Sequence, residues 1–252
     1  MDIEGAVAIV TGANRGIGEG FVRAFIEAGA EKVYVGARNT ADAAHLVDNF
    51  GDRAIAVALD VTDGAQVAAA AEMCSDVSVV VNNAGVFTDR LLIAADDMSG
   101  ARQEMEVNYF GTLAMCRAFA PILAANGGGA IVNVLSAAAL VDIPNMGGYG
   151  PSKTATRFLS AGVRAELADQ GTQVTALIVG SVETRMSAHV KGRKEQPIDV
   201  GRAGIKAIRH NLDEMDTDWM ATKVRASVAL DPKGYERRLA ELLKADVLDT
   251  GR

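Results

Sequence analysis

The chain has 252 residues, of which 49% are hydrophobic, so it is long enough to bury a sizeable core. Its net charge of −7 argues against nucleic acid as the main partner, because phosphate binding needs a basic face. No apolar run of about 18 residues predicts a membrane span, and the acidic start lacks the features of a signal peptide, so a cytoplasmic location is expected. The two cysteines, Cys74 and Cys116, have neither metal-ligand spacing nor a disulfide pattern, and no metal site is expected.

Short apolar runs alternate with amphipathic segments along the first 180 residues. Strands are expected at 6–10, 32–36, 54–61, 77–85, 129–139 and 173–180, and helices at 18–27, 41–49, 65–73, 99–125 and 149–168. The strands are near-continuous apolar runs, as expected when helices cover both faces of a parallel sheet. This order predicts an α/β fold with a doubly wound parallel sheet, and residues 1–252 are expected to form a single domain.

The pattern weakens beyond Gly180. Residues 184–197 are interpreted as a substrate loop, and their basic cluster at 191–194 as a solvated segment that could also attract an anionic substrate. A C-terminal extension at 211–252 follows a helix at 199–210, with a short segment at 213–216 and helices at 218–229 and 232–245. Four apolar side chains of the extension could cover the core or meet another subunit: Trp219, Tyr235, Leu239 and Leu242.

A glycine-rich turn joins the first strand to the first helix. The segment TGANRGIG places Gly12, Gly16 and Gly18 there, where glycines allow a tight turn and close approach of a pyrophosphate to the helix N-terminus. The spacing G-x-x-x-G-x-G differs from the usual G-x-G-x-x-G, so a purely structural turn is the alternative. Its position after the first strand of an α/β chain favours dinucleotide binding.

The end of the second strand indicates which dinucleotide is bound. An acid there would accept hydrogen bonds from the ribose of NAD, whereas an arginine accommodates the 2′-phosphate of NADP. This chain has Arg38 at that point, and Arg15 in the glycine turn supplies a second cation. The sequence therefore predicts NADP(H) as the preferred cofactor, with NAD(H) possible. The alternative is that both arginines are ordinary solvated side chains.

The segment GGYGPSKTA at 147–155 places a tyrosine one helical turn before a lysine. A free tyrosine has a pKa of about 10, and a nearby ammonium is expected to lower it. Tyr149 and Lys153 share a helix face if the helix begins near Tyr149, which would also make Pro151 acceptable in the first turn. A solvated pair on a helix surface is the alternative for these two residues taken alone.

The ordered set of motifs resembles one family, the short-chain dehydrogenases/reductases. The resemblance spans about residues 3–210 and implies a Rossmann-like fold. The matching segments are TGANRGIG at 11–18, Asp60 and Val61, NNAG at 82–85, Asn108 in EVNYFGT, Ser136, the Tyr149–Lys153 pair, and 180–184. Ser136 lies thirteen residues before Tyr149, which is also the family's spacing.

The resemblance implies a role for each matching residue. Tyr149 would be the general acid and base, Lys153 would hold the nicotinamide ribose and stabilise the tyrosinate, and Ser136 would bind the substrate oxygen. Asn108 would support a water-linked proton relay. Asp60 and Val61 would contact the adenine, Asn83 to Gly85 the adenosine ribose, and Val182 and Thr184 the carboxamide. The full cofactor set is Gly12, Asn14, Arg15, Gly16, Ile17, Gly18, Arg38, Asp60, Val61, Asn83, Ala84, Gly85, Tyr149, Lys153, Gly180, Val182 and Thr184. The family also implies a homo-oligomer, a dimer or tetramer.

The expected substrate pocket is mostly apolar. Its candidates are Val86, Phe87, Leu91, Ala138 to Val141, Ile143, Met146, Met186 and Val190, with Asp142, Arg90 and Arg185 as polar exceptions. Such a pocket suits a hydrophobic ketone or aldehyde, or the matching alcohol. Val179 stands where the family usually has proline, and Gly180 is expected to preserve close approach to the nicotinamide.

Three alternatives accompany the prediction of an NADP(H)-dependent carbonyl reductase or alcohol dehydrogenase. An NAD-dependent alcohol dehydrogenase would use the same residues. A catalytically silent dinucleotide-binding regulator typically lacks the Tyr or Lys, and both are present here. A sugar-nucleotide epimerase or dehydratase of the family's extended branch typically carries T-G-x-x-G-x-x-G and a larger C-terminal domain. The glycine spacing and the length of 252 residues count against that last alternative.

Overall fold

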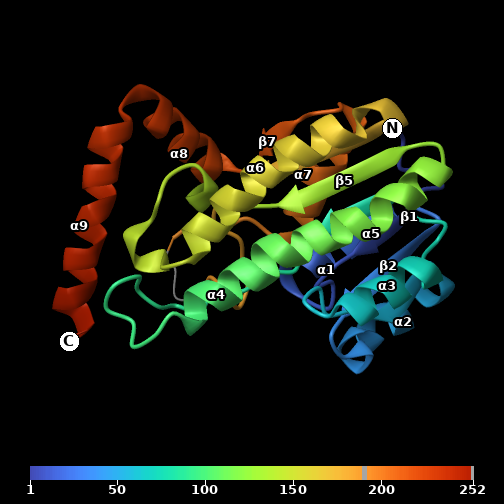
Figure 1. The fold of residues 1–252 in the computed structure, drawn as a ribbon, viewed down its shortest axis with the longest axis horizontal. Helices are drawn as coiled ribbons and strands as arrows, with labels where there is room; N and C mark the ends of the chain where they lie inside the picture. Colours follow the sequence, from blue (N-terminus) through green and yellow to red (C-terminus); the bar gives the residue numbers. More distant parts are fainter. Residues whose placement is uncertain (189–191, 251–252) are drawn as a thin grey trace.

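Seven parallel strands form one twisted sheet in the computed structural model, which describes residues 1–188 and 192–250 (Figure 1). The strands are β1 (Val7–Val10), β2 (Lys32–Ala37), β3 (Ala54–Ala58), β4 (Val79–Asn82), β5 (Gly129–Val134), β6 (Thr172–Ile178) and β7 (Glu214–Asp216). Their order is β3-β2-β1-β4-β5-β6-β7, and every pairing is parallel. The predicted doubly wound α/β fold is therefore confirmed.

The topology places a ligand site at the carboxyl ends of β1 and β4. The chain winds outward from β1 in one direction to β3 and in the other to β7, so β1 and β4 are neighbours although two strands separate them in sequence. Val10 at the end of β1 is in register with Val35 of β2 and Val81 of β4. Open α/β sheets bind ligands outside the carboxyl ends of the strands at such a point of reversal.

Helices cover both faces of the sheet (Figure 1). Their bounds are α1 (Gly16–Glu27), α2 (Ala44–Phe50), α3 (Gly64–Met73), α4 (Ser99–Met105), α5 (Thr112–Ala125), α6 (Tyr149–Leu167), α7 (Pro197–Arg209), α8 (Trp219–Leu230) and α9 (Pro232–Thr250), with short 3-10 turns η4 (Ala137–Ala139) and η5 (Pro144–Met146). No described helix is both long enough and apolar enough to cross a lipid bilayer.

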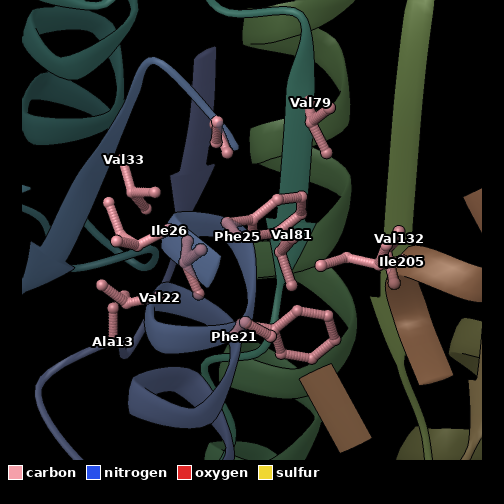
Figure 2. Close-up of a cluster of buried hydrophobic side chains, with 14 of the residues drawn as sticks. Ala13, Phe21, Val22, Phe25, Ile26, Val33, Val79, Val81, Val132 and Ile205 are labelled. Atoms are coloured by element: carbon pink, nitrogen blue, oxygen red, sulfur yellow. The ribbon is translucent and has the colours of Figure 1, made fainter. Parts of the chain in front are cut away.

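Alternate strand residues point into two separate cores, which explains why the strands are apolar without interruption. Val33, Val79 and Val81 belong to a cluster with side chains of α1 and α7. Figure 2 shows part of that cluster, where Phe21 and Phe25 of α1 lie against the strands. The intervening residues, such as Val80, pack on the opposite face against α3, α5 and α6. Each strand is thus buried on both faces, as a parallel sheet requires.

The helix expected at 99–125 is interrupted by a π-helical turn, η3 (Glu106–Gly111). The turn inserts a residue into the helical repeat between α4 and α5, and it carries Asn108. Such π turns are rare and occur frequently at functional sites. Apolar periodicity does not reveal them, because the residues on either side remain helical.

The C-terminal extension packs over the carboxyl end of β5. Val224 of α8 contacts Ala137 and Val141, and Tyr235 and Leu239 of α9 pack against this group. Tyr235 and Leu239 therefore cover the core, whereas Trp219 is 41% exposed. The segment expected at 213–216 forms β7, paired with β6 through Leu177 and Met215. Three predicted features lie outside the described part of the chain: Val190 of the pocket, Lys191 of the basic cluster and the side chain of Leu242.

Candidate active site

Each glycine of the turn after β1 has a distinct structural reason. Gly12 and Gly16 adopt positive φ angles of 60° and 56°, a region that side chains disfavour. Gly18 has an ordinary backbone, but a Cβ there would lie 2.3 Å from the carbonyl oxygen of Gly12 and 2.6 Å from Nδ2 of Asn83. The three glycines therefore allow the turn to close tightly over the N-terminus of α1. The exposed backbone there forms a cradle that fits a pyrophosphate.

The turn is bonded to the end of β4. The hydroxyl of Thr11 accepts the amide hydrogens of Asn83 (3.0 Å) and Ala84 (2.9 Å). The side-chain amide of Asn83 donates to the carbonyls of Thr11 (2.9 Å) and Gly12 (3.1 Å). Asn83 therefore holds the glycine turn in place, and its amide hydrogens are already used by the protein rather than free for a ribose.

Two arginines flank this cradle without partners. Arg15 is the extended residue directly before α1, and Arg38 directly follows β2. Both side chains are exposed, and among residues 1–188 and 192–250 neither forms an ion pair or a side-chain hydrogen bond. Their charges are consequently available to an anion at the carboxyl ends of β1 and β2.

The residues expected at the adenine organise the turn after β3. One carboxylate oxygen of Asp60 accepts hydrogen bonds from the amide (3.0 Å) and hydroxyl (2.7 Å) of Thr62. Val61 is buried, and a Cβ on Gly111 would lie 2.5 Å from its Cγ2. The Val61 side chain therefore packs against the π turn that carries Asn108.

Tyr149, Lys153 and Ser136 converge at the carboxyl end of β5. Tyr149 is the first residue of α6, and its side chain and that of Lys153 are 8% and 5% exposed. The Lys153 ammonium lies 5.7 Å from the centre of the Tyr149 ring and donates to the carbonyl of Val134 (2.9 Å). Ser136, two residues beyond β5, hydrogen-bonds the Tyr149 phenol. The predicted helix start at Tyr149 is confirmed.

Burial dominates the protonation of both groups. Desolvation raises the pKa of Tyr149 to about 12, opposed by the hydrogen bond from Ser136 and reinforced by the negative charge of Glu104. Desolvation also lowers the pKa of Lys153 to about 8. The expectation that Lys153 lowers the Tyr149 pKa is therefore wrong for this structure. The physical reason is that burial penalises the phenolate and the ammonium alike, and the ammonium is bonded to Val134.

Asn108 is fixed by hydrogen bonds through all its polar side-chain groups. Its Oδ1 accepts from the amide of Val86 (2.8 Å), and its Nδ2 donates to the Val86 carbonyl (3.0 Å) and the Ser152 hydroxyl (2.9 Å). Its main-chain carbonyl accepts the hydroxyls of Thr112 (2.8 Å) and Thr156 (3.0 Å). The expected relay through Asn108 would therefore start from a residue whose oxygens are already bonded to protein.

Gly85 lies between Asn108 and Lys153. A Cβ on Gly85 would stand 3.2 Å from Oδ1 of Asn108 and 3.4 Å from Nζ of Lys153. Asn108, Ser136, Tyr149 and Lys153 are thus gathered around the ends of β4 and β5, next to the glycine cradle. Ile17 of the predicted cofactor set packs against the core, and Asn14 is half-buried in the cradle.

Gly180 serves a different contact from the one expected. Its amide donates to the carboxylate of Asp218 (2.7 Å), and a Cβ on Gly180 would lie 2.2 Å from Oδ1 of Asp218. The missing side chain therefore admits the start of α8, whereas close approach to a nicotinamide was expected. Val182 is buried, and Thr184 lies over the glycine turn, with its methyl 3.4 Å from a Cβ placed on Gly16.

The described part of the 184–197 segment is held to the end of β6. The amide of Glu195 donates to the carbonyl of Ser181 (2.9 Å), and the Glu195 carbonyl accepts from Glu183 (2.9 Å). Arg193 pairs with Glu195 (3.0 Å), and Lys194 with Glu183 (3.6 Å). Two cations of the basic cluster are therefore neutralised within the segment, which weakens the expectation that it attracts an anionic substrate.

The predicted pocket residues divide between the site and its surroundings. Phe87 packs edge-on against Tyr149, with ring centres 5.6 Å apart. Leu140 and Val141 pack under α8, whereas Leu91 and Met186 are 41% and 44% exposed. A groove of about 890 Å³ lies elsewhere, lined by Leu92, Met105, Tyr109, Asp142, Gly150, Pro151, Thr154, Ala155, Phe158 and Leu159. Its lining includes none of the four predicted catalytic residues.

One buried acid beside Tyr149 was missed by the sequence analysis. Glu104 on α4 is 1% exposed, and it lies one helical turn before Asn108 in the sequence. That spacing of four residues is the signal that could have found it, because it would place both side chains on one helix face. Within residues 1–188 and 192–250, no group of three or more His, Cys, Asp or Glu side chains could hold a metal ion.

Comparisons with known proteins agree with this geometry. The family model described as short chain dehydrogenase matches residues 6–195. A short chain dehydrogenase from Burkholderia cenocepacia, solved in complex with NADP, is 40% identical with a TM-score of 0.89, over 95% of this chain and 99% of that chain. Galactitol 2-dehydrogenase (L-tagatose-forming) from Cereibacter sphaeroides is 36% identical over 77% of this chain and 78% of its own length. A 3-ketoacyl-(acyl-carrier-protein) reductase from Brucella melitensis, complexed with NADH, is 28% identical with a TM-score of 0.79, over 86% of this chain and 98% of that chain.

Proposed function

The chain belongs to the short-chain dehydrogenase/reductase family of NAD(P)-dependent oxidoreductases, and on that premise we propose that it interconverts a hydrophobic ketone or aldehyde and the corresponding alcohol with NADP(H). The observation that carries this proposal is the convergence of Ser136, Tyr149 and Lys153 at the end of β5, beside the glycine cradle at the end of β1. A proton donor and a dinucleotide cradle at one edge of a sheet are what carbonyl reduction requires.

The residues have separable tasks in this mechanism. The bound nicotinamide would supply the hydride in reduction and accept it in oxidation. Ser136 holds the substrate oxygen, and the Tyr149 hydroxyl donates its proton to that oxygen as the C–O group becomes an alkoxide. In oxidation Tyr149 takes the proton back. Phe87 and the Ala138 to Val141 segment exclude water from the substrate side of the phenol.

The protonation of the site favours reduction near neutral pH. Because the pKa of Tyr149 is raised to about 12, the phenol carries the proton that reduction consumes. The pKa of Lys153 is lowered to about 8, so its ammonium is within reach of exchange at neutral pH and can return a proton to the site. Asn108 holds Ser152 and the Val86 backbone around this lysine and keeps its position.

NADP(H) is proposed over NAD(H) because of the two unpaired arginines. Arg15 and Arg38 flank the cradle and are free to bind a 2′-phosphate, for which guanidinium groups are well suited. The relative from Burkholderia cenocepacia holds NADP, which supports the assignment, whereas the reductase from Brucella melitensis holds NADH. NAD(H) therefore stays the alternative cofactor.

The test is a panel of hydrophobic ketones and aldehydes, assayed with NADPH and NADH in parallel. Oxidation of NADPH by the wild-type protein is expected, and Tyr149→Phe should remove at least 99% of turnover while NADPH binding persists. Near-normal activity of the Tyr149→Phe variant would exclude the mechanism. Tight NADPH binding with no turnover on any carbonyl would instead favour the catalytically silent regulator.

We also propose that the chain assembles as a homo-oligomer, a dimer or a tetramer. Two phenylalanines support this: Phe158 on α6 is 76% exposed and Phe110 at the start of α5 is 49% exposed. Phe158 lines the 890 Å³ groove, whose apolar lining would be covered by another copy. Light scattering of the wild type and of Phe158→Glu tests the proposal, which predicts a smaller assembly for the variant. A cytoplasmic location and a single domain across residues 1–252 stay predictions.

A further inference from the structure

Glu104 is an acid buried without an ionic partner in the described part of the chain. One oxygen of its carboxylate, Oε1, accepts hydrogen bonds from the amide (2.8 Å) and the hydroxyl (2.9 Å) of Thr88. The other, Oε2, has no hydrogen-bond partner among the described residues. A carboxyl group that is 1% exposed with an unsatisfied oxygen is costly, so its retention calls for a physical explanation.

The surroundings of Glu104 are shaped to admit its carboxylate. A Cβ on Gly148 would lie 2.7 Å from Oε2, and one on Gly100 would lie 2.7 Å from the hydroxyl of Thr88. Gly148 directly precedes Tyr149, and Gly100 lies one turn before Glu104 on α4. Glycine at both positions thus leaves room for the Glu104–Thr88 contact between α4 and the start of α6, two helices that pack together.

Thr88 connects this contact to the catalytic phenol. The preceding residue, Phe87, packs edge-on against the Tyr149 ring, and the following residue, Asp89, turns the chain with a positive φ of 55°. Glu104 therefore touches the Tyr149 region from two directions: through Thr88 to the Phe87 ring, and through Gly148 to the Tyr149 backbone.

From this geometry, and resting on the proposed function, we propose that Glu104 is a positioning residue for Tyr149. Its carboxylate fixes the Phe87–Thr88 segment against the start of α6 and places a buried negative charge beside the phenol. Glu104 acts through Thr88, Gly148 and the electric field, and it is not assigned a contact with substrate.

The charge has a defined direction of effect. A negative group near a phenol disfavours the phenolate, and Glu104 is one of the causes that raise the Tyr149 pKa. The other groups facing Tyr149 are Lys153 on α6, Ser136 after β5, and Asp142, whose Oδ1 lies 3.0 Å from a Cβ placed on the neighbouring Gly150. Glu104 would thus keep Tyr149 protonated and bias the site toward reduction.

The experiment compares Glu104→Gln with Glu106→Gln. Glutamine keeps the shape and the bonds from Thr88 but removes the charge, and Glu106 is an exposed acid two residues away on the π turn. The ultraviolet absorbance of tyrosinate is titrated, with Tyr149→Phe subtracted to isolate one of the four tyrosines. Glu104→Gln is expected to lower the Tyr149 midpoint by on the order of one pH unit, and Glu106→Gln to leave it unchanged.

Kinetics supply the second readout. In Glu104→Gln, the rise of alcohol oxidation with pH should move to lower pH by the same amount, so oxidation below that limb increases about tenfold for each unit. Thr88→Val keeps the carboxylate and the Thr88 amide, so it should leave the midpoint in place and lower kcat by roughly two- to tenfold through loosened positioning. Circular dichroism verifies that each variant is folded.

The outcomes separate this inference from the proposed function. An unchanged midpoint in Glu104→Gln, or an equal shift in Glu106→Gln, would overturn the electrostatic role, and an unchanged kcat in Thr88→Val would overturn the positioning role. The absorbance titration needs no turnover. A wild-type protein that reduces no carbonyl would therefore contradict the proposed function while leaving the effect of Glu104 on Tyr149 measurable.

Discussion

The amide of Gly180 and the carboxylate of Asp218 are joined by a 2.7 Å hydrogen bond that ties the end of β6 to the start of α8. The same carboxylate accepts the amides of Met220 (2.9 Å) and Ala221 (3.0 Å), so it also caps the helix. The side chain of Val224 from this helix then covers Ala137 and Val141, which follow Ser136. One carboxylate thus fixes the helix that closes the site on the substrate side.

Replacing Asp218 by alanine is expected to loosen this closure. The loss of a helix cap costs about 1 kcal/mol, and the Gly180 amide would lose its partner as well. We expect a lower free energy of unfolding in urea and a severalfold higher KM for the carbonyl. The matched control is Asp231→Ala, which removes the bond to the Gly234 amide (2.9 Å) at the start of α9 but leaves Gly180 untouched. An equal rise in KM in both variants would contradict the specific role of the Gly180 contact.

Adding one methyl group to the glycine turn should abolish cofactor binding. In Gly18→Ala the new Cβ would meet the Gly12 carbonyl at 2.3 Å, so the cradle must open. Fluorescence titration with NADPH is expected to show at least a hundredfold weaker binding. Gly162→Ala on α6 is the control, because a Cβ there meets nothing within 4 Å and alanine favours a helix. Wild-type affinity in Gly18→Ala would remove the turn from the cofactor site.

The sequence predicted the features that depend on local pattern. The strand order, the glycine turn and the helix beginning at Tyr149 follow from apolar runs and from residues with special backbone requirements. The third strand was expected to reach Val61 but ends at Ala58, because the chain then turns through Asp60 and Thr62. Strand ends depend on pairing with neighbours, which a single segment does not reveal.

Other features depend on contacts between distant segments. β7 has three half-buried residues, two of them acidic, and it exists because Met215 pairs with Leu177. The acids are compensated elsewhere, since Arg157 of α6 reaches Glu214 (2.6 Å) and Arg225 of α8 reaches Asp216 (2.7 Å). The raised pKa of Tyr149 likewise comes from burial and from Glu104, forty-five residues earlier, so spacing to Lys153 alone gave the wrong sign.

Lys153 makes the stability of the protein depend on pH. Burial lowers its pKa in the folded state to about 8, below the value of about 10.4 expected when unfolded. Between these values the unfolded chain binds more protons, so the contribution of Lys153 to the free energy of unfolding rises with pH from about 8 to about 10.4. Above about 10, Tyr149 acts in the opposite direction, because its folded pKa is raised to about 12.

Lys153→Met tests this linkage. Methionine fills a similar volume without a charge, so at pH 7 we expect the variant to be more stable than wild type by about 1–2 kcal/mol, while catalysis is lost. Urea unfolding at pH 7, 8.5 and 10 should show the difference shrinking as pH rises. Lys206→Met on α7 is the control, because that lysine is exposed. A stability difference that does not change with pH would contradict the lowered pKa of Lys153.

Arg38 should decide the choice between the two dinucleotides. Arg38→Asp replaces a free cation beside the cradle with an acid that repels a 2′-phosphate and can accept hydrogen bonds from ribose hydroxyls. We expect kcat/KM with NADPH to fall roughly a hundredfold, with NADH unchanged or improved. Arg237→Asp on α9 makes the same reversal of charge at an exposed position and controls for net charge. Because the adenosine ends of the cofactors differ only by that phosphate, an equal loss with both would show that Arg38 supports the fold of the site and does not read the phosphate.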